Sequence, residues 1–160
     1  MEAFRQVTRT RQALDNHACK EQLKHTKRGV LSVIGDFGYP YGMPLNHYYD
    51  EEDQTLYFHS GLKGHRNDAL RANPKASFCI MDEGYHKEGD WALTFNCVIV
   101  FGTVFTVEES EKRLDIIKKL SAKFTSDTDY VEDEIRRLDK ATLVYGLKIQ
   151  HMTGKTVHEQ

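Results

Sequence analysis

The sequence predicts a mainly β domain of the α+β class, in which about six antiparallel strands close into a barrel and helices pack outside it. Two patterns predict this fold. Several segments alternate apolar and polar residues with the period of two that is typical of strands, and only one short helical segment interrupts their run. The regular alternation of strand and helix that marks a parallel sheet is missing from the pattern, so antiparallel pairing is expected.

The first third of the chain is expected to form one helix and three strands. Asp15 is the predicted N-cap of a short helix that ends near Thr26 and places Cys19 and Leu23 on one face. Apolar runs and turn residues then predict strands over residues 29–35, 41–49 and 54–60, separated by turns over 36–40 and 50–53. The first two of these strands are expected to pair as a hairpin.

The third predicted strand has a clear alternation of faces. Leu56 and Phe58 fall on one face, and Tyr57 and His59 fall on the other. The elements expected after it are a short helix over residues 64–72, a strand over 75–82, a charged loop over 83–90 and a long strand over 91–108. Gly102 is expected to bend this long strand.

The last third of the chain is expected to contribute two helices and a closing strand, over residues 110–124, 129–140 and 142–152. The apolar stripe of the first helix consists of Leu114, Ile117, Leu120 and Phe124. The second helix is expected to begin with a capping box of Asp129 and Glu132, and it places Val131, Ile135 and Leu138 on one face. The residues that the closing strand turns toward one face are Leu143, Tyr145, Leu147 and Ile149.

Composition limits the class of protein. A chain of 160 residues suits one domain over 1–160, and a net charge of −2 gives no overall basic field for nucleic acid. No apolar run reaches the roughly 18 residues of a membrane span, and residues 1–11 lack the apolar core of a secretory signal. We therefore expect a cytoplasmic protein with neither nucleic acid nor membrane as a partner.

Cysteine and histidine spacing gives no sign of a metal site. The three cysteines, Cys19, Cys79 and Cys97, are far apart and form no C-x-x-C pair, and the eight histidines form no H-x-x-x-H pattern. We expect no metal. Since Cys79 and Cys97 fall within apolar strand patterns, they are expected to be small buried hydrophobes.

The strongest chemical signal lies in residues 56–66. An aromatic-rich strand ends at Ser60, and Lys63 and Arg66 then flank Gly64 where a helix is expected to begin. A hydroxyl, two cations and the free N–H groups of a helix N-terminus are the donors that a phosphate dianion requires, and arginine adds bidentate contact. The segment therefore predicts a phosphate site made by Ser60, Lys63 and Arg66.

Seven segments in order resemble one known family. They read RGVL (28–31), GYPYGMPL (38–45), LYFHS (56–60), KGHR (63–66), LRANPKASF (70–78), VIVFG (98–102) and HMTGK (151–155). Together they are similar to the nitroimidazole-resistance (Nim)-like branch of the pyridoxamine 5'-phosphate oxidase-like FMN-binding split barrels. The resemblance extends over nearly the whole chain, from about residue 9 to residue 155.

This resemblance implies a six-stranded antiparallel split β-barrel of the FMN-binding type. It also implies a homodimer that holds FMN in two symmetric grooves between its subunits. The implied activity is that of an oxidoreductase in which FMN passes reducing equivalents to a small-molecule substrate, with a nitroaromatic as the test acceptor.

The remaining cofactor contacts follow from the needs of a flavin ring. The backbone expected along the hydrogen-bonding edge of the ring is that of Met43, Pro44, Leu45 and Asn46. Pro44 supports this, because a residue without an N–H is usually found at a sheet edge. His59 and His65 are the candidate catalytic residues, as proton donors or polar contacts, and both are also expected to touch the cofactor.

A second function stays open at this point. Split-barrel relatives include proteins that bind a flavin or haem without turnover, so the chain could be a non-catalytic flavin- or haem-binding module, and a deazaflavin could replace FMN. Oxidation of pyridoxamine 5'-phosphate itself is not expected, because residues 156–160 lack the arginine-rich substrate signature of that subfamily.

Overall fold

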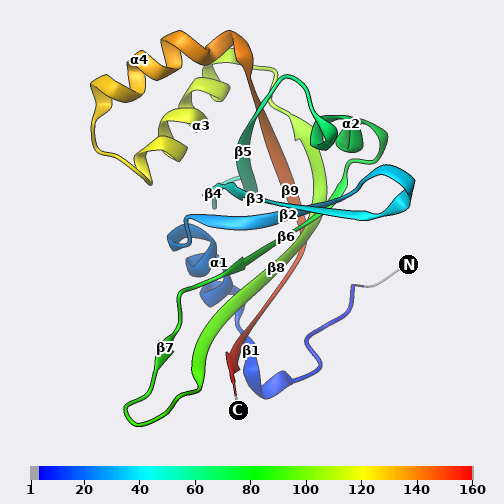
Figure 1. The fold of residues 1–160 in the computed structure, drawn as a ribbon, viewed down its shortest axis with the longest axis vertical. Coiled ribbons are helices and arrows are strands. Elements are labelled where there is room, and N and C mark those ends of the chain that lie inside the picture. Colours follow the sequence, from blue (N-terminus) through cyan, green and yellow to red (C-terminus); the bar gives the residue numbers. More distant parts are fainter. Residues whose placement is uncertain (1–3, 160) are drawn as a thin grey trace.

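One antiparallel sheet curls into a half-barrel with helices along its outside (Figure 1). The computed structural model describes residues 4–159, except the side chains of residues 138 and 139. Six longer strands correspond to the six predicted ones: β2 (Arg28–Ile34), β3 (Pro40–Asn46), β5 (Thr55–Gly61), β6 (Lys75–Met81), β8 (Leu93–Thr106) and β9 (Thr142–His158). Three short strands join them: β1 (Ala13–Leu14), β4 (Tyr48–Asp50) and β7 (Tyr85–His86). The predicted fold class is confirmed.

Four α-helices flank the sheet: α1 (Asn16–His25), α2 (His65–Ala72), α3 (Ser110–Ala122) and α4 (Thr128–Leu138). Short 3-10 turns occur at η1 (Thr10–Gln12), η2 (Asp36–Gly38) and η3 (Asp139–Ala141). The predicted cap of α1 is confirmed, because a carboxylate oxygen of Asp15 accepts the N–H of Ala18 at 2.7 Å. No helix within the described residues is long and apolar enough to cross a lipid bilayer.

The capping box predicted for α4 was placed two residues too late. Asp127 is the cap, since its carboxylate accepts the backbone N–H of Tyr130 at 3.0 Å. Asp129 therefore lies inside the first turn, where its charge faces the positive end of the helix dipole.

The strand order is β3-β2-β6-β8-β9-β5-β4, so β3 and β4 are the two end strands of this path. The long ladder between β8 and β9 holds the half-barrel together, and its register shifts between Phe101 and Gly102. A Cβ at position 102 would lie 2.1 Å from the carbonyl oxygen of Lys148, so only glycine allows the two backbones to approach here. The predicted bend at Gly102 is confirmed as a β-bulge.

Several strand boundaries differ from the prediction because their partners are distant in the sequence. The strand expected over residues 41–49 is divided at His47 into β3 and β4. The closing strand continues past Met152 to His158, since β8 pairs with it as far as Thr94. Part of the expected loop over 83–90 forms β7, which pairs with the start of β8.

The alternation predicted for β5 is confirmed. Leu56 and Phe58 point into the barrel interior, which contains most of the hydrophobic core. Tyr57 points the other way into a second cluster, where Ile116 of α3 and Val144 of β9 cover it. Both faces of β5 are therefore covered from Thr55 to Phe58, and His59 becomes exposed where the strand ends beside α2.

The burial predicted for two cysteines was wrong. Cys19 is buried, but Cys79 is exposed and Cys97 is only half-buried. The alternation of β6 explains this, because Phe78 and Ile80 occupy the inner face and turn Cys79 to the outer face of the sheet.

His47 is fully buried at the break between β3 and β4. Its Nε2 lies 2.8 Å from the carbonyl oxygen of Leu23, so this nitrogen carries the proton and donates it. The imidazole meets the ring of Phe78 edge-on at 5.0 Å between centroids. Burial, together with the charge of Lys123, lowers the pKa of His47 to about 4.

We expect this buried imidazole to make folding stability fall in mild acid. A histidine whose pKa is lower in the folded state binds its proton in the unfolded chain first, so stability is lost as pH falls from about 6.5 toward 4. The expected loss from His47 is roughly 3 kcal/mol. His47→Gln keeps a donor for Leu23 without titrating, so chemical unfolding at pH 7 and pH 4.5 should show a flatter profile. The exposed His25→Gln serves as control, and equal profiles for wild type and His47→Gln would contradict the assignment.

Candidate functional site

Arg66 lies in the first turn of α2, directly behind the end of β5. Gly64 is the N-cap of this helix and has a φ of 131°, a conformation that side chains other than hydrogen rarely adopt. This turn places the guanidinium carbon of Arg66 6.0 Å from the centroid of the Phe58 ring. The cation therefore sits over an aromatic ring of the barrel interior.

The guanidinium of Arg66 is half-buried and has no acidic partner among the described residues. Its Nε is buried without a hydrogen bond. Burial lowers the pKa of Arg66, and the groups that act in the opposite direction are the phenols Tyr145 and Tyr41. A desolvated cation without a counter-charge costs free energy that a bound anion would offset, so this position fits a phosphate.

The other predicted phosphate contacts surround this turn. Lys63 is exposed in the loop between β5 and α2. Ser60 is buried, and its hydroxyl donates to the side-chain oxygen of Asn67 at 3.1 Å, while the Asn67 amide donates to the carbonyl of Gly61 at 2.7 Å. The Ser60 proton thus stabilises the β5–α2 turn in this structure, and donation to a phosphate would require the hydroxyl to rotate.

His65 joins α2 to the turn that follows β2. Its ring stacks on Tyr41 at 4.2 Å between centroids and 21° between planes. Its Nε2 accepts the backbone N–H of Asp36 at 3.2 Å, so Nδ1 carries the proton of the neutral ring. His65 is therefore adjacent to Arg66 but already holds a structural contact.

β3 offers an unpaired backbone edge. It is an end strand, and the bond from the N–H of His47 to the carbonyl of Lys27 (3.4 Å) shows which residues face β2. Antiparallel pairing alternates, so the residues that turn their backbone groups outward are Gly42, Pro44 and Asn46. Pro44 thus loses no ladder bond, and the predicted edge position of this strand is confirmed.

Met43 and Leu45 alternate with these positions, and their side chains pack against the barrel core. Of the four residues predicted to lie along a flavin ring, these two therefore turn their side chains toward the core and their backbone groups toward β2, which leaves the outward contacts to Pro44 and Asn46. Asn46 differs, because its side chain lines a pocket.

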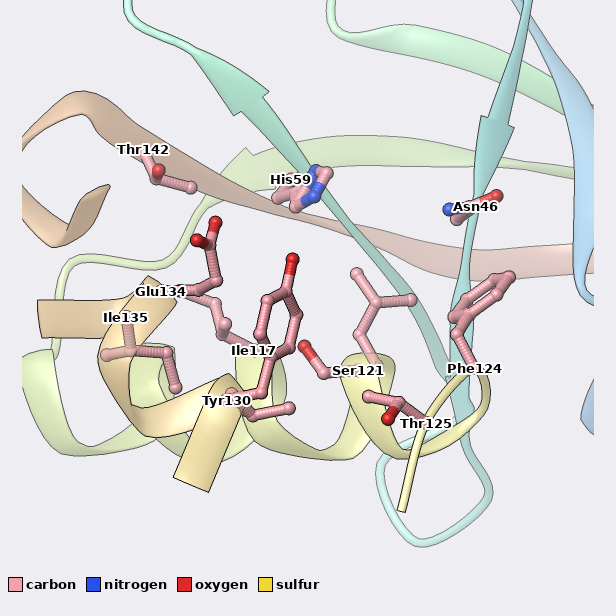
Figure 2. A pocket seen from close by; sticks show the side chains of 12 residues that line it. Asn46, His59, Ile117, Ser121, Phe124, Thr125, Tyr130, Glu134, Ile135 and Thr142 are labelled. Atoms are coloured by element: carbon pink, nitrogen blue, oxygen red, sulfur yellow. The ribbon is translucent and has the colours of Figure 1, made fainter. Parts of the chain in front are cut away.

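That pocket has a volume of about 280 Å³ and lies between β5, the end of β3 and the α3–α4 pair (Figure 2). We call it the His59 pocket. Its polar lining comprises Asn46, His59, Ser121, Thr125, Tyr130, Glu134 and Thr142. Its apolar lining comprises Ile117, Leu120, Phe124, Val131 and Ile135. In Figure 2 the Tyr130 hydroxyl and the Glu134 carboxylate point from the helices toward the side of the pocket that carries His59.

His59 links the pocket to the cation on α2. The ring is exposed to the pocket, yet the surrounding walls desolvate it. This desolvation, and secondly the charge of Arg66, lower the pKa of His59. The imidazole is therefore neutral at pH 7, and it can donate or accept a hydrogen bond within the pocket.

The structure brings together Asn46 and His59, which the sequence separates by a whole hairpin, and it places Arg66 close enough to influence His59 electrostatically. The sequence prediction missed Tyr130 and Glu134 of α4, together with Ser121 of α3. One signal was present, because Ser121 lies four residues after Ile117 and Glu134 lies three residues after Val131, so both adjoin the predicted apolar stripes at helical spacing. Three members of the α3 stripe, Ile117, Leu120 and Phe124, line the pocket.

A sequence profile described as pyridoxamine 5'-phosphate oxidase matches residues 15–156. The chain belongs to the pyridoxamine 5'-phosphate oxidase-like family. Its members share the flavin-binding split barrel, and the predicted family is confirmed. No curated protein sequence matches the chain significantly.

Solved structures support the same fold. A candidate 5-nitroimidazole antibiotic resistance protein from Bacteroides thetaiotaomicron superposes with a TM-score of 0.75 at 19% identity, covering 92% of this chain and 87% of that one. A FAD-binding protein from Mesorhizobium loti gives 0.67 at 21% identity, covering 91% and 96%. A FAD and haem binding protein from Mycobacterium smegmatis gives 0.70 at 17% identity, covering 90% and 72%. At these identities the likeness is one of fold.

The desolvated charge of Arg66 predicts an unusual response to mutation. In flavin-free protein, Arg66→Met keeps the aliphatic stem and removes the unpaired charge, so we expect the free energy of unfolding to rise by about 1 kcal/mol or more. Inorganic phosphate should raise the melting temperature of wild type but not of this variant.

The control is Arg71→Met on the same helix, because Arg71 is exposed and pairs with Asp68 at 3.0 Å. That variant should behave like wild type in both measurements. A clear loss of stability in Arg66→Met would show that the guanidinium is satisfied within the protein.

Proposed function

We propose that this protein is an FMN-dependent oxidoreductase that reduces a small organic acceptor of the nitroaromatic type. The observation that carries the proposal is the half-buried guanidinium of Arg66, whose Nε has no partner among the described residues and which lies beside the His59 pocket. A phosphate group matches this position in charge and in hydrogen-bonding capacity.

Different residues of the site would bind different parts of FMN. Arg66 would hold the phosphate, with the exposed Lys63 as a second cation and the N–H groups of the α2 N-terminus as further donors. The outward backbone groups of Gly42, Pro44 and Asn46 would lie along the polar edge of the flavin ring. When bound, FMN supplies the redox chemistry, and the protein supplies position and electrostatics.

His59 and His65 would take different roles. His59 faces the pocket as a neutral imidazole, so it can hold a hydrogen bond to the acceptor and pass a proton to it. His65 is held by Asp36 and by Tyr41, which favours a role in positioning Arg66 rather than in proton transfer.

A homodimer is part of the proposal. On the outer face of the sheet, Val30, Cys79 and Ile99 are paired across three neighbouring strands. Met81 and Phe101 lie nearby on β6 and β8. The side chains of Val30, Ile99, Met81 and Phe101 are exposed. A contiguous apolar surface of this kind is typical of an interface between chains. The His59 pocket is too small to hold a flavin, so a second chain would supply the wall that covers a flavin ring lying along the edge of β3.

A second candidate function is a non-catalytic flavin- or haem-binding module. The neutral, pocket-facing imidazole of His59 favours it, because neutral histidine is the form that ligates haem iron. The absorbance spectrum separates the two: flavin bands that bleach with NADH or NADPH and return with acceptor support the oxidoreductase, whereas a Soret band supports haem binding.

The phosphate assignment predicts a selective loss of FMN affinity. Arg66→Gln removes a charge-assisted bidentate contact, so the dissociation constant for FMN should rise roughly 10- to 100-fold. Arg71→Gln, on the same helix and exposed, should retain wild-type affinity. Fluorescence titration of flavin-free protein measures both, and equal affinities in the two variants would refute the assignment.

The dimer proposal predicts a mass of twice the 18.5 kDa chain in sedimentation. Ile99→Glu places a charge within the apolar sheet face, so it should give monomers and weaken FMN binding. Phe37→Glu is the control, since Phe37 is an exposed apolar residue in η2, the turn between β2 and β3, and is not one of the facing strand residues. A wild-type monomer that holds FMN would contradict the proposal.

A further inference from the structure

The amphipathic helix α4 turns its apolar stripe toward a hollow. Val131 and Ile135 lie on this stripe, and both line the His59 pocket. A surface helix normally buries such a stripe against the core. Here Ile117 and Leu120 of the neighbouring α3 continue this apolar lining, and the strand side of the roughly 280 Å³ hollow carries the polar His59, Asn46 and Thr142 (Figure 2). A ligand with apolar faces would complete the packing that the chain leaves unfinished.

The described polar residues that line the pocket include one acidic side chain and no basic lysine or arginine. Glu134 is the one carboxylate in the described lining, and neither lysine nor arginine is part of that lining. His59 is neutral near pH 7, because burial and the neighbouring Arg66 lower its pKa. The pocket is thus weakly negative, whereas the adjacent turn with Lys63 and Arg66 is positive.

The carboxylate of Glu134 remains able to act on a ligand. Arg137 contacts its Oε1 from one turn further along the helix, and the Arg137 side chain is largely exposed and does not line the pocket. No residue in the described part of the chain bonds to Oε2. In Figure 2 the carboxylate points toward the side of the pocket where His59 and Thr142 lie.

We propose that the His59 pocket binds the organic acceptor and selects small planar molecules that are neutral or cationic, with Glu134 as the residue that discriminates against anions. This inference rests on the proposed function for the reaction, but the selection concerns binding alone. The size of the pocket limits the acceptor to roughly one or two rings, below the range of drug-sized ligands. Anions are directed instead to the positive turn at α2.

Three probes with the same nitrobenzene ring and different charge test the selection: 4-nitrobenzylamine (cationic), 4-nitrobenzyl alcohol (neutral) and 4-nitrobenzoate (anionic). Calorimetric titration of the purified protein, with whatever flavin it retains, gives dissociation constants without electron transfer. We expect the benzoate to bind at least about five-fold more weakly than the other two. Glu134→Gln should reduce that difference toward unity.

Glu132→Gln is the matched control. Glu132 lies on the same helix, pairs with Lys118 at 3.5 Å and is not part of the His59 pocket, so the charge preference should persist. Should Glu134→Gln fail to fold, the wild-type order of the three probes still decides the selection.

The outcomes separate this inference from the proposed function. Charge-ordered binding without reduction by NADH or NADPH supports the pocket and contradicts the oxidoreductase. Reduction of all three probes with equal dissociation constants supports the oxidoreductase and overturns the selection. Tightest binding of the benzoate, or failure of all three probes to bind, also overturns the selection.

Discussion

The uncompensated charge of Arg66 is the constraint on which the rest of the site depends. A half-buried guanidinium is costly unless something pairs with it, and the chain supplies an aromatic ring but no carboxylate among its described residues. The turn that carries Arg66 is nevertheless firmly held, because Asn67 ties Ser60 to the carbonyl of Gly61. A rigid scaffold that keeps a cation desolvated is pre-organised for an anion, and here it gives up stability to do so.

Electrostatics also divides the neighbourhood into two parts. The beginning of α2 is positive, the helix-lined pocket carries the carboxylate of Glu134, and His59 lies between them as a neutral ring. A cofactor with an anionic tail and an uncharged ring system would lie along this gradient in one orientation only. The half-barrel adds the unpaired edge of β3, and thereby supplies backbone donors and acceptors where side chains are turned inward.

Local patterns were sufficient for most of the fold. The alternation in β5, the Asp15 cap and the bend at Gly102 all depend on residues close in sequence, and the structure confirms them. Strand ends were less predictable, because a strand continues as long as a distant partner offers hydrogen bonds. The extension of β9 along β8 and the exposure of Cys79 are both consequences of pairing and layering that no short window contains.

For the site, the sequence by itself determined which residues form the phosphate turn and that Pro44 suits the edge of a sheet. Glycine and proline set the conformations open to their own backbone, and lysine and arginine carry their charge wherever they lie. Only the tertiary structure decided that the Arg66 Nε has no hydrogen-bond partner among the described residues and that α4 faces His59 across a hollow. Burial, counter-charges and cavities are properties of what surrounds a residue. They arise when segments from opposite ends of the chain meet, and so they cannot be read from any one of those segments.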